Sequence, residues 1–278
     1  FSIFRFSFGC LIQLNENCTC NGQSFRVKIC KNGLGQNIVR NVTILGNQNS
    51  RFEMILWEIN DIELKSFDML NLVPQADFSF NNIKYLKSGL FIRMSRLALL
   101  RLDNNELEII ENDTFAGLLS LQVLFLRRNQ IFRIEIDAFR TLRSLTDIRL
   151  NYNILDNLDF LTNIPQLILL SAANNDIKKI NNSTFVRLVN LQEINLQYSK
   201  IVEIDSNAFI TLRRLRVLLL DFNELNKISN FSSQFTSMTS FAISSNKIEI
   251  LDENIFNFVN NINRFSIQKN IIKKIKKK

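Results

Sequence analysis

One pattern of eleven positions, L-x-x-L-x-L-x-x-N-x-L, recurs along this sequence of 278 residues at intervals of 21 to 24 residues. A repeat this short cannot bury its own apolar face, so successive copies have to stack and share one continuous core. The pattern therefore predicts a solenoid of about ten coils. The ten copies begin at Phe52, Val73, Leu97, Leu121, Leu145, Leu167, Leu191, Leu215, Met238 and Ile262.

Each position of the repeat has a physical role. Alternating apolar residues such as Leu100 and Leu102 predict a short strand with one face in the core, and the strands of successive copies are expected to form a parallel sheet. An Asn side chain can satisfy backbone groups where the chain leaves the strand. The Asn column consists of Asn60, Asn81, Asn105, Asn129, Asn153, Asn175, Ser199, Asn223, Asn246 and Asn270.

A column of Phe lies six residues before each new copy and accounts for part of the 24 Phe of the chain. Stacked aromatic rings at this position are expected to fill the outer, convex half of each coil. Leu161 and Ser232 interrupt the column, so the convex wall is predicted to be irregular in the fifth and eighth copies. The column consists of Phe67, Phe91, Phe115, Phe139, Phe185, Phe209 and Phe256.

The composition argues against an enzyme. The chain contains no His, which removes Ser-His-Asp triads, Cys-His pairs and the usual zinc sites. Asp147 and Glu193 are carboxylates near the predicted inner surface, but they lie two predicted strands apart. No catalytic residue, metal site or cofactor is therefore predicted.

The net charge of +8 belongs mostly to the C-terminal end. Six of the eight charges come from lysines among the last ten residues, which leaves +2 for the preceding 268 residues. A nearly balanced body does not favour nucleic-acid binding, which depends on neutralising phosphates. The six are Lys269, Lys273, Lys274, Lys276, Lys277 and Lys278.

The four cysteines, Cys10, Cys18, Cys20 and Cys30, all lie within 21 residues. An even number in a short segment indicates a disulfide framework and an oxidising compartment, with three pairings open. A zinc site made of four thiolates is the alternative, although the usual CxxC pairs are missing.

The repeat resembles the typical 24-residue class of leucine-rich repeats of extracellular animal proteins, over about residues 38–272. The resemblance implies an α/β repeat fold: a curved horseshoe with a parallel inner β-sheet and an irregular or short-helical convex side. The cysteine cluster resembles the N-terminal cysteine cap of that class. The cap of the family implies pairs Cys10–Cys20 and Cys18–Cys30, with a strand around residues 25–29.

The first 60 residues also resemble arthropod proteins similar to the non-catalytic subunit of Oplophorus luciferase, and chaoptin-like, slit-like and Toll-like ectodomains share the same repeats. The predicted organisation has four parts. Residues 1–9 fit the remnant of a signal peptide or a disordered start, 10–36 the cap, 37–272 the repeats and 273–278 a lysine-rich tail. The C-terminal cysteine cap of the family is missing, so we expect either a truncated chain or closure by the lysines.

Six N-x-S/T sequons support a secreted or cell-surface glycoprotein. Four of the six are predicted to carry glycans, and the other two are Asn17 and Asn181. Asn17 is expected to be unused because it lies inside the cap. The predicted glycosylation sites are Asn41, Asn112, Asn182 and Asn230.

The inner sheet is the expected binding face, because it presents an ordered row of side chains with little backbone entropy left to lose. Cationic and aromatic residues, which often anchor binding, meet there on three adjacent strands. The predicted ligand-binding residues are Arg101, Phe125, Arg127, Arg149, Tyr152, Asn195 and Tyr198.

These observations favour a non-enzymatic extracellular module that binds a protein ligand, a receptor ectodomain or a glycan, in adhesion, signalling or immune recognition. The alternative, which the arthropod resemblance implies, is a non-catalytic partner subunit of a secreted enzyme. We expect no nucleic acid as partner. A membrane anchor is expected only outside this sequence, because no apolar run in it is long enough to span a bilayer. The sequence leaves the oligomeric state open.

Overall fold

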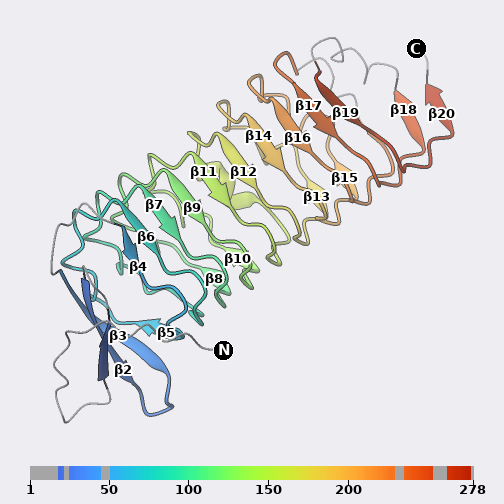
Figure 1. Cartoon of the computed structure of the whole chain (residues 1–278). Coiled ribbons are helices and arrows are strands. Elements are labelled where there is room, and N and C mark those ends of the chain that lie inside the picture. Colours follow the sequence, from blue (N-terminus) through green and yellow to red (C-terminus); the bar gives the residue numbers. More distant parts are fainter. Residues whose placement is uncertain (1–17, 22–24, 45–50, 229–234, 253–261, 277–278) are drawn as a thin grey trace.

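A computed structural model describes residues 18–21, 25–44, 51–228, 235–252 and 262–276. Its main element is a ten-stranded parallel sheet whose strands follow one another in chain order, one from each coil (Figure 1). The strands are β4 (Phe52–Glu53), β6 (Gln75–Asp77), β7 (Leu99–Arg101), β9 (Val123–Phe125), β11 (Asp147–Arg149), β12 (Leu169–Ser171), β14 (Glu193–Asn195), β16 (Val217–Leu219), β17 (Ser240–Ala242) and β19 (Arg264–Ser266).

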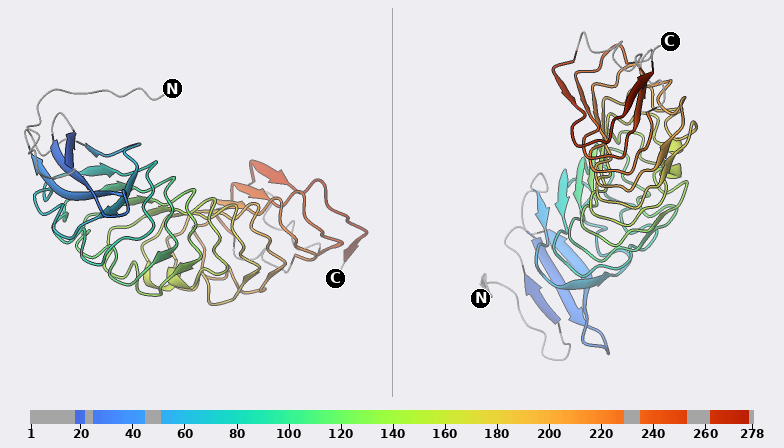
Figure 2. Two further views of the ribbon diagram at one scale, coloured as in Figure 1. Left: turned by 90° about the horizontal axis from the view of Figure 1, so that it is seen from below. Right: turned by 90° about the vertical axis from the view of Figure 1, so that its right-hand side faces the viewer.

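The coils form an arc, with the sheet on the inner side and the connecting segments on the outer side (Figure 2). Nine connections join the ten strands, which confirms the predicted solenoid and its register. The alternation of the strands is also confirmed. Leu100, Leu124 and Ile148 are fully buried, and the residues on either side of each face the inner surface.

The convex side has less helix than the term α/β implies. Within the described ranges it contains one helix, the 3-10 helix η1 (Asp159–Asn163). In the described residues the other connections contain turns and short parallel strand pairs. The pairs are β8 (Ile109–Ile110) with β10 (Arg133–Ile134), β13 (Lys179–Ile180) with β15 (Glu203–Ile204), and β18 (Ile250–Asp252) with β20 (Lys274–Lys276).

The Asn column joins each coil to its neighbours through buried hydrogen bonds. The side-chain amide of Asn129 donates to the carbonyl oxygen of Leu102 in the preceding coil, at 3.0 Å, and to that of Leu126 in its own coil, at 3.1 Å. Its oxygen accepts from the N–H of Leu107 at 3.0 Å. The same arrangement recurs at Asn105, so the prediction for this column is confirmed.

The Phe column is also confirmed. Rings of adjacent coils stack at centroid distances of 5.5 to 6.1 Å, as in Phe115 and Phe139 at 5.7 Å and 18°. The column is irregular in the fifth coil, where Phe160 meets Phe139 edge to face at 75°. There the sequence placed only Leu161 in the column, yet Phe160 is buried beside it and continues the aromatic contact.

In the eighth coil Phe235 meets Phe209 at a tilt of 49°, in agreement with the predicted irregularity. Ser232 and Phe256 lie outside the described residues.

The N-terminal segment forms a second sheet with the order β1–β2–β3–β5. Its strands are β1 (Cys18–Asn21), β2 (Phe25–Lys31), β3 (Asn37–Ile44) and β5 (Ile59–Ile62). Strands β1 to β3 are antiparallel, whereas β5 runs parallel to β3. The cap and the first coils therefore share β3.

Cys30 is bonded in a disulfide, and Cys18 is its register partner across β1 and β2. This register suits a Cys18–Cys30 bridge, but the pairing itself stays a prediction. Cys10 lies outside the described residues, and Cys20 is opposite Lys28 in the same register.

Replacing Asn129 with Ala is expected to lower the free energy of unfolding by about 1–3 kcal/mol, because it leaves the buried N–H of Leu107 without a partner. The carbonyls of Leu102 and Leu126 each lose one of two amide donors and keep the amide of Asn105 or Asn153. Urea denaturation followed by circular dichroism measures the change. Ser199→Asn is the matched test in the opposite direction.

Ser199 donates to the carbonyl of Ala172 but has no acceptor that reaches the N–H of Ile177, the counterpart of Leu107. We expect Ser199→Asn to raise the free energy of unfolding by about 1 kcal/mol. A lower value for this variant would show that the coil has no room for the amide.

Candidate binding face

The inner face is built from rows of side chains that run across the strands. One row passes in register through Arg101, Phe125 and Arg149, and then through Ser171, Asn195 and Leu219. The residue types predicted to meet on β7, β9 and β11 are therefore side by side. Arg127 follows Phe125 by two residues and faces the same side, as its contacts below show.

Phe125 lies beneath three guanidinium groups. The Cζ atoms of Arg101, Arg127 and Arg149 are 4.1, 5.2 and 5.1 Å from the centre of its ring. Only 6% of Phe125 is exposed, so this residue supports the arginines and offers little surface of its own to a ligand. Cations over an aromatic face are attracted by about 0.5–2 kcal/mol each.

Two buried carboxylates hold the first two arginines. Asp103 forms an ion pair with the guanidinium of Arg127 at 3.1 Å, and it also accepts a hydrogen bond from the backbone N–H of Arg127 at 2.7 Å. Arg101 lies 3.9 Å from both Asp103 and Asp77, and Arg51 also pairs with Asp77. Because a buried charge is costly unless it is paired, these contacts fix the positions of the arginines.

Arg149 is held separately by its neighbour in β11. Its Nε and Nη2 donate to the two carboxylate oxygens of Asp147 at 3.1 and 2.9 Å. The hydrogen bond to Asp147 raises the pKa of Arg149 above its ordinary value, although partial burial opposes the change. The guanidinium therefore stays charged and oriented.

The sequence predicted a basic and aromatic group, and this expectation needs correction. Asp77, Asp103 and Asp147 balance Arg101, Arg127 and Arg149, so the group is close to neutral. The sequence could have predicted this neutralisation, because the three aspartates occupy outward-facing strand positions, as the arginines do. The guanidinium groups nevertheless remain partly exposed and open to a ligand.

A second row lies at the rim, in the position just before the Asn column. Its backbone has φ of 53° to 60°, a conformation that bulky side chains rarely adopt. Tyr152 and Tyr198, predicted to bind ligand, belong to this row together with Phe80 and Phe222. These four aromatic residues are 44 to 51% exposed. The row consists of Phe80, Asn104, Arg128, Tyr152, Asn174, Tyr198, Phe222, Ser245 and Lys269.

Two contacts organise the aromatic side chains of this rim. The guanidinium of Arg128 is 4.9 Å from the centre of the Tyr152 ring. The rings of Tyr198 and Phe222 stack at 4.2 Å with an interplanar angle of 7°. These contacts hold the aromatic side chains of the rim in defined positions. Phe80 and Phe222 were not among the ligand-binding residues predicted from the sequence.

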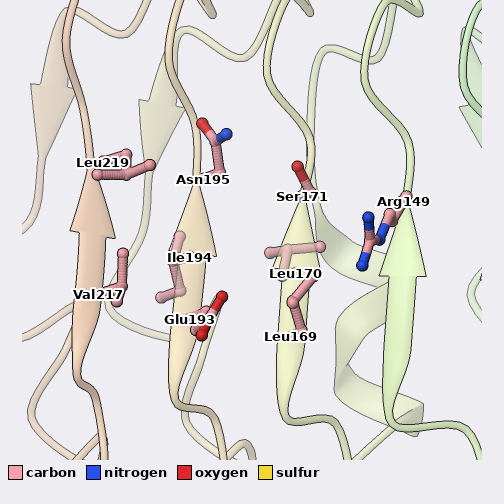
Figure 3. A pocket seen from close by; sticks show the side chains of 9 residues that line it. All are labelled: Arg149, Leu169, Leu170, Ser171, Glu193, Ile194, Asn195, Val217 and Leu219. Atoms are coloured by element: carbon pink, nitrogen blue, oxygen red, sulfur yellow. The ribbon is translucent and has the colours of Figure 1, made fainter.

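A hollow of about 240 Å³ lies on the inner face next to the arginine group (Figure 3). Arg149 borders it on β11, and Asn195, also predicted to bind ligand, borders it on β14. Ser171 stands between them and leaves space because its side chain is short. The lining residues are Arg149, Leu169, Leu170, Ser171, Glu193, Ile194, Asn195, Val217 and Leu219.

The predicted glycosylation sites differ in what the structure shows. Asn112 and Asn182 are exposed, and Asn112 accepts the N–H of Asp137 at 3.1 Å. Thr114, the hydroxyl residue of the Asn112 sequon, is only 1% exposed. Asn41 belongs to β3, and Asn230 lies outside the described residues.

No group of three or more His, Cys, Asp or Glu residues within the described ranges is arranged to hold a metal ion. The same part of the chain has no helix with the length and apolar character needed to cross a bilayer.

The family model described as Leucine rich repeat matches residues 77–131 and 165–225. A chain of the octameric complex of Latrophilin 3, Unc5D and FLRT2 has a TM-score of 0.76 at 18% identity, over 94% of this chain and 78% of that one. The leucine-rich repeat domain of APL1 has a TM-score of 0.70 at 21% identity, over 82% and 58%. The chain has the leucine-rich-repeat fold.

Two curated leucine-rich-repeat relatives match shorter stretches. Leucine-rich repeat-containing G-protein coupled receptor 5 of Rattus norvegicus is 39% identical over 77 residues, which are 28% of this chain and 8% of the receptor. Transforming growth factor beta activator LRRC33 of Danio rerio is 27% identical over 132 residues, 45% of this chain and 19% of the activator. The matched region thus spans less than a fifth of either relative.

The rim of this fold offers a stability test. Phe80→Asn is expected to raise the free energy of unfolding by about 0.5–1 kcal/mol, because Asn tolerates the left-handed backbone better than Phe does. Phe80→Ala keeps the unfavourable conformation and serves as the control, with no gain expected. Urea denaturation of both variants checks the difference, and a loss in Phe80→Asn would mean that the ring packs within the fold.

Proposed function

We propose that this chain is a non-enzymatic extracellular recognition module that binds a protein ligand through its concave face, in adhesion, signalling or immune recognition. The observation that carries the proposal is the arginine group, Arg101, Arg127 and Arg149, fixed over the ring of Phe125 by three carboxylates. Part of each guanidinium remains exposed for a partner.

Preorganisation supports this use of the face. A long side chain usually loses rotamer entropy when it is immobilised at an interface, at a cost of about 0.5–1.5 kcal/mol. Here the ion pairs and the aromatic support have already restricted the arginines in the free protein. Arg and Tyr are also the residue types most enriched among the residues that dominate binding energy.

The comparisons support a protein as the ligand. The names of the matched proteins include a receptor and a growth-factor activator, and one similar structure is a complex of mouse RP105 with MD-1. The predicted cysteine cap and the sequons support a location outside the cell. A glycan ligand is an alternative outcome of the binding test below.

A non-enzymatic role agrees with the state of the carboxylates on this face. Asp77, Asp103 and Asp147 each form an ion pair with an arginine of the group. Glu193, on β14, is two strands away from Asp147 on β11. Within the described part of the face, Glu193 thus has no second unpaired carboxylate on an adjacent strand, which supports a binding role.

The test compares binding of the secreted chain, labelled and made multivalent, to panels of cells and extracellular-matrix proteins. Arg127→Gln combined with Arg149→Gln is expected to reduce binding by about tenfold or more, because both exposed guanidinium anchors are lost. Glutamine is preferred to a charge reversal, which would place carboxylates beside Asp103 and Asp147. Surface plasmon resonance or flow cytometry measures the loss.

Arg143→Gln combined with Arg213→Gln is the matched control, because both arginines are exposed in the turns that precede β11 and β16. Thermal unfolding of both double variants separates a loss of contact from a loss of fold. Unchanged binding in a folded Arg127/Arg149 variant would remove this site. Co-purification with a secreted enzyme at fixed stoichiometry would instead favour the role of a partner subunit.

A further inference from the structure

The acidic residues of the inner sheet face are engaged by partners, with one exception. Asp77, Asp103 and Asp147 pair with arginines, as described above, and Glu53 pairs with Arg51 at 2.7 Å. Asp221 accepts the side-chain amide of Gln197 and the backbone N–H of Ser244, both at 2.7 Å.

Glu193 is the exception. Its side chain is exposed at the start of β14 and makes no ion pair or side-chain hydrogen bond with a described residue. A carboxylate is well solvated by water, so the absence of a partner does not destabilise the fold. It leaves one full negative charge available on a face where the other acidic residues are neutralised or hydrogen-bonded.

This carboxylate borders the hollow next to Arg149 (Figure 3). In the sheet register Glu193 is flanked by Leu169 on β12 and by Val217 on β16, so aliphatic side chains lie on both sides of the charge. Ser171, Asn195 and Leu219 form the adjoining row. The hollow thus combines apolar walls with a single acidic group.

The charges around the hollow favour a cation. Arg149 carries the opposite charge and interacts electrostatically with Glu193, but its Nε and Nη2 donate to the carboxylate of Asp147. The three groups Arg149, Asp147 and Glu193 together carry one net negative charge. A ligand anion would be repelled by this excess negative charge, whereas a ligand cation would gain an ion pair in a partly enclosed site.

The size of the hollow favours a single side chain. Its volume of about 240 Å³ is below the range of roughly 300–1,000 Å³ that is typical of pockets for drug-sized molecules. Lys and Arg have an apolar stem and a charged end, and they commonly lay the stem along apolar surface. The walls formed by Leu169 and Val217 match the stem, and Glu193 matches the charged end.

We propose that this hollow binds a Lys or Arg side chain of the protein ligand, with the cation on the carboxylate of Glu193 and the aliphatic stem between Leu169 and Val217. The proposal rests on the proposed function of the concave face. It names the chemistry that the ligand must present there.

The probes are four blocked tripeptides, acetyl-Ala-Xaa-Ala-amide with Lys, Arg, norleucine or Glu in the centre. The protein carries labelled Leu and Val methyl groups, whose chemical shifts are followed by NMR. We expect the Lys or Arg peptide to shift the methyl signals of Leu169 and Val217 in a saturable way, in the millimolar range of about 1–10 mM. Norleucine lacks the charge and Glu reverses it, so both are expected to bind at least about tenfold more weakly.

Two variants locate the site. Glu193→Gln removes the charge while keeping the shape, and it is expected to weaken binding of the basic peptide by about tenfold and to abolish its dependence on salt. Ser171→Leu fills the hollow and is expected to prevent binding. Glu108→Gln, a change at an exposed glutamate beside β8, is the matched control and is expected to have no effect.

The proposal is overturned if neither basic peptide shifts these methyl signals, or if Glu193→Gln binds as well as the wild type. Its failure is distinguishable from failure of the proposed function. Cell or matrix binding that requires Arg127 and Arg149 but not Glu193 would remove this inference alone. Peptide binding at Glu193 combined with cell binding that is insensitive to the arginines would remove the arginine group as the main site and keep the hollow.

Discussion

The buried hydrogen bonds of the Asn column are the constraint on which the rest of the structure depends. Each coil leaves the sheet through a turn whose N–H and C=O groups have no helix or strand to satisfy them. The amide of a residue such as Asn129 satisfies groups in its own coil and in the preceding one. The residue before Asn129 or Asn153 has positive φ, which places Arg128 and Tyr152 at the rim, and Tyr198 has the same conformation before Ser199. The repeated turn thus combines hydrogen bonds that hold the coils together with a backbone conformation that exposes one row of side chains.

The sequence predicted the fold well because the repeat converts position along the chain into position in space. Once the coils are in register, the residue between two buried strand positions must face inward, and its neighbour 24 residues later must lie beside it, as Arg101 and Phe125 do. Prediction was weaker where a copy departs from the pattern. A shorter fifth coil turns Phe160 inward beside Leu161, and no period-based rule decides which of the two completes the column.

The binding face shows a different limit of prediction. Register alone brought Arg101, Phe125 and Arg149 together, but it did not give the exposure of Phe125, which depends on how three long side chains lie over the ring. The pairing of Arg127 with Asp103 likewise depends on side-chain conformation across two coils. A count of positive charges therefore overestimates the basic character of a face whose arginines are already neutralised.

This neutralisation changes which residues can decide specificity. Arg101 and Arg127 already interact with carboxylates of this protein. Their attraction for an anionic group of a ligand is therefore weaker than that of an unpaired arginine. Glu193 forms no ion pair or side-chain hydrogen bond with a described residue. In the coils that follow, the inner face carries the small side chains of Ala242, Ser244 and Ser266. The paired arginines would then provide a rigid, shape-complementary surface, whereas the unpaired carboxylate would provide most of the charge selectivity. If both proposals hold, a ligand would be selected by where its cation lies relative to the arginine group, because the two features are held in one sheet at a fixed spacing.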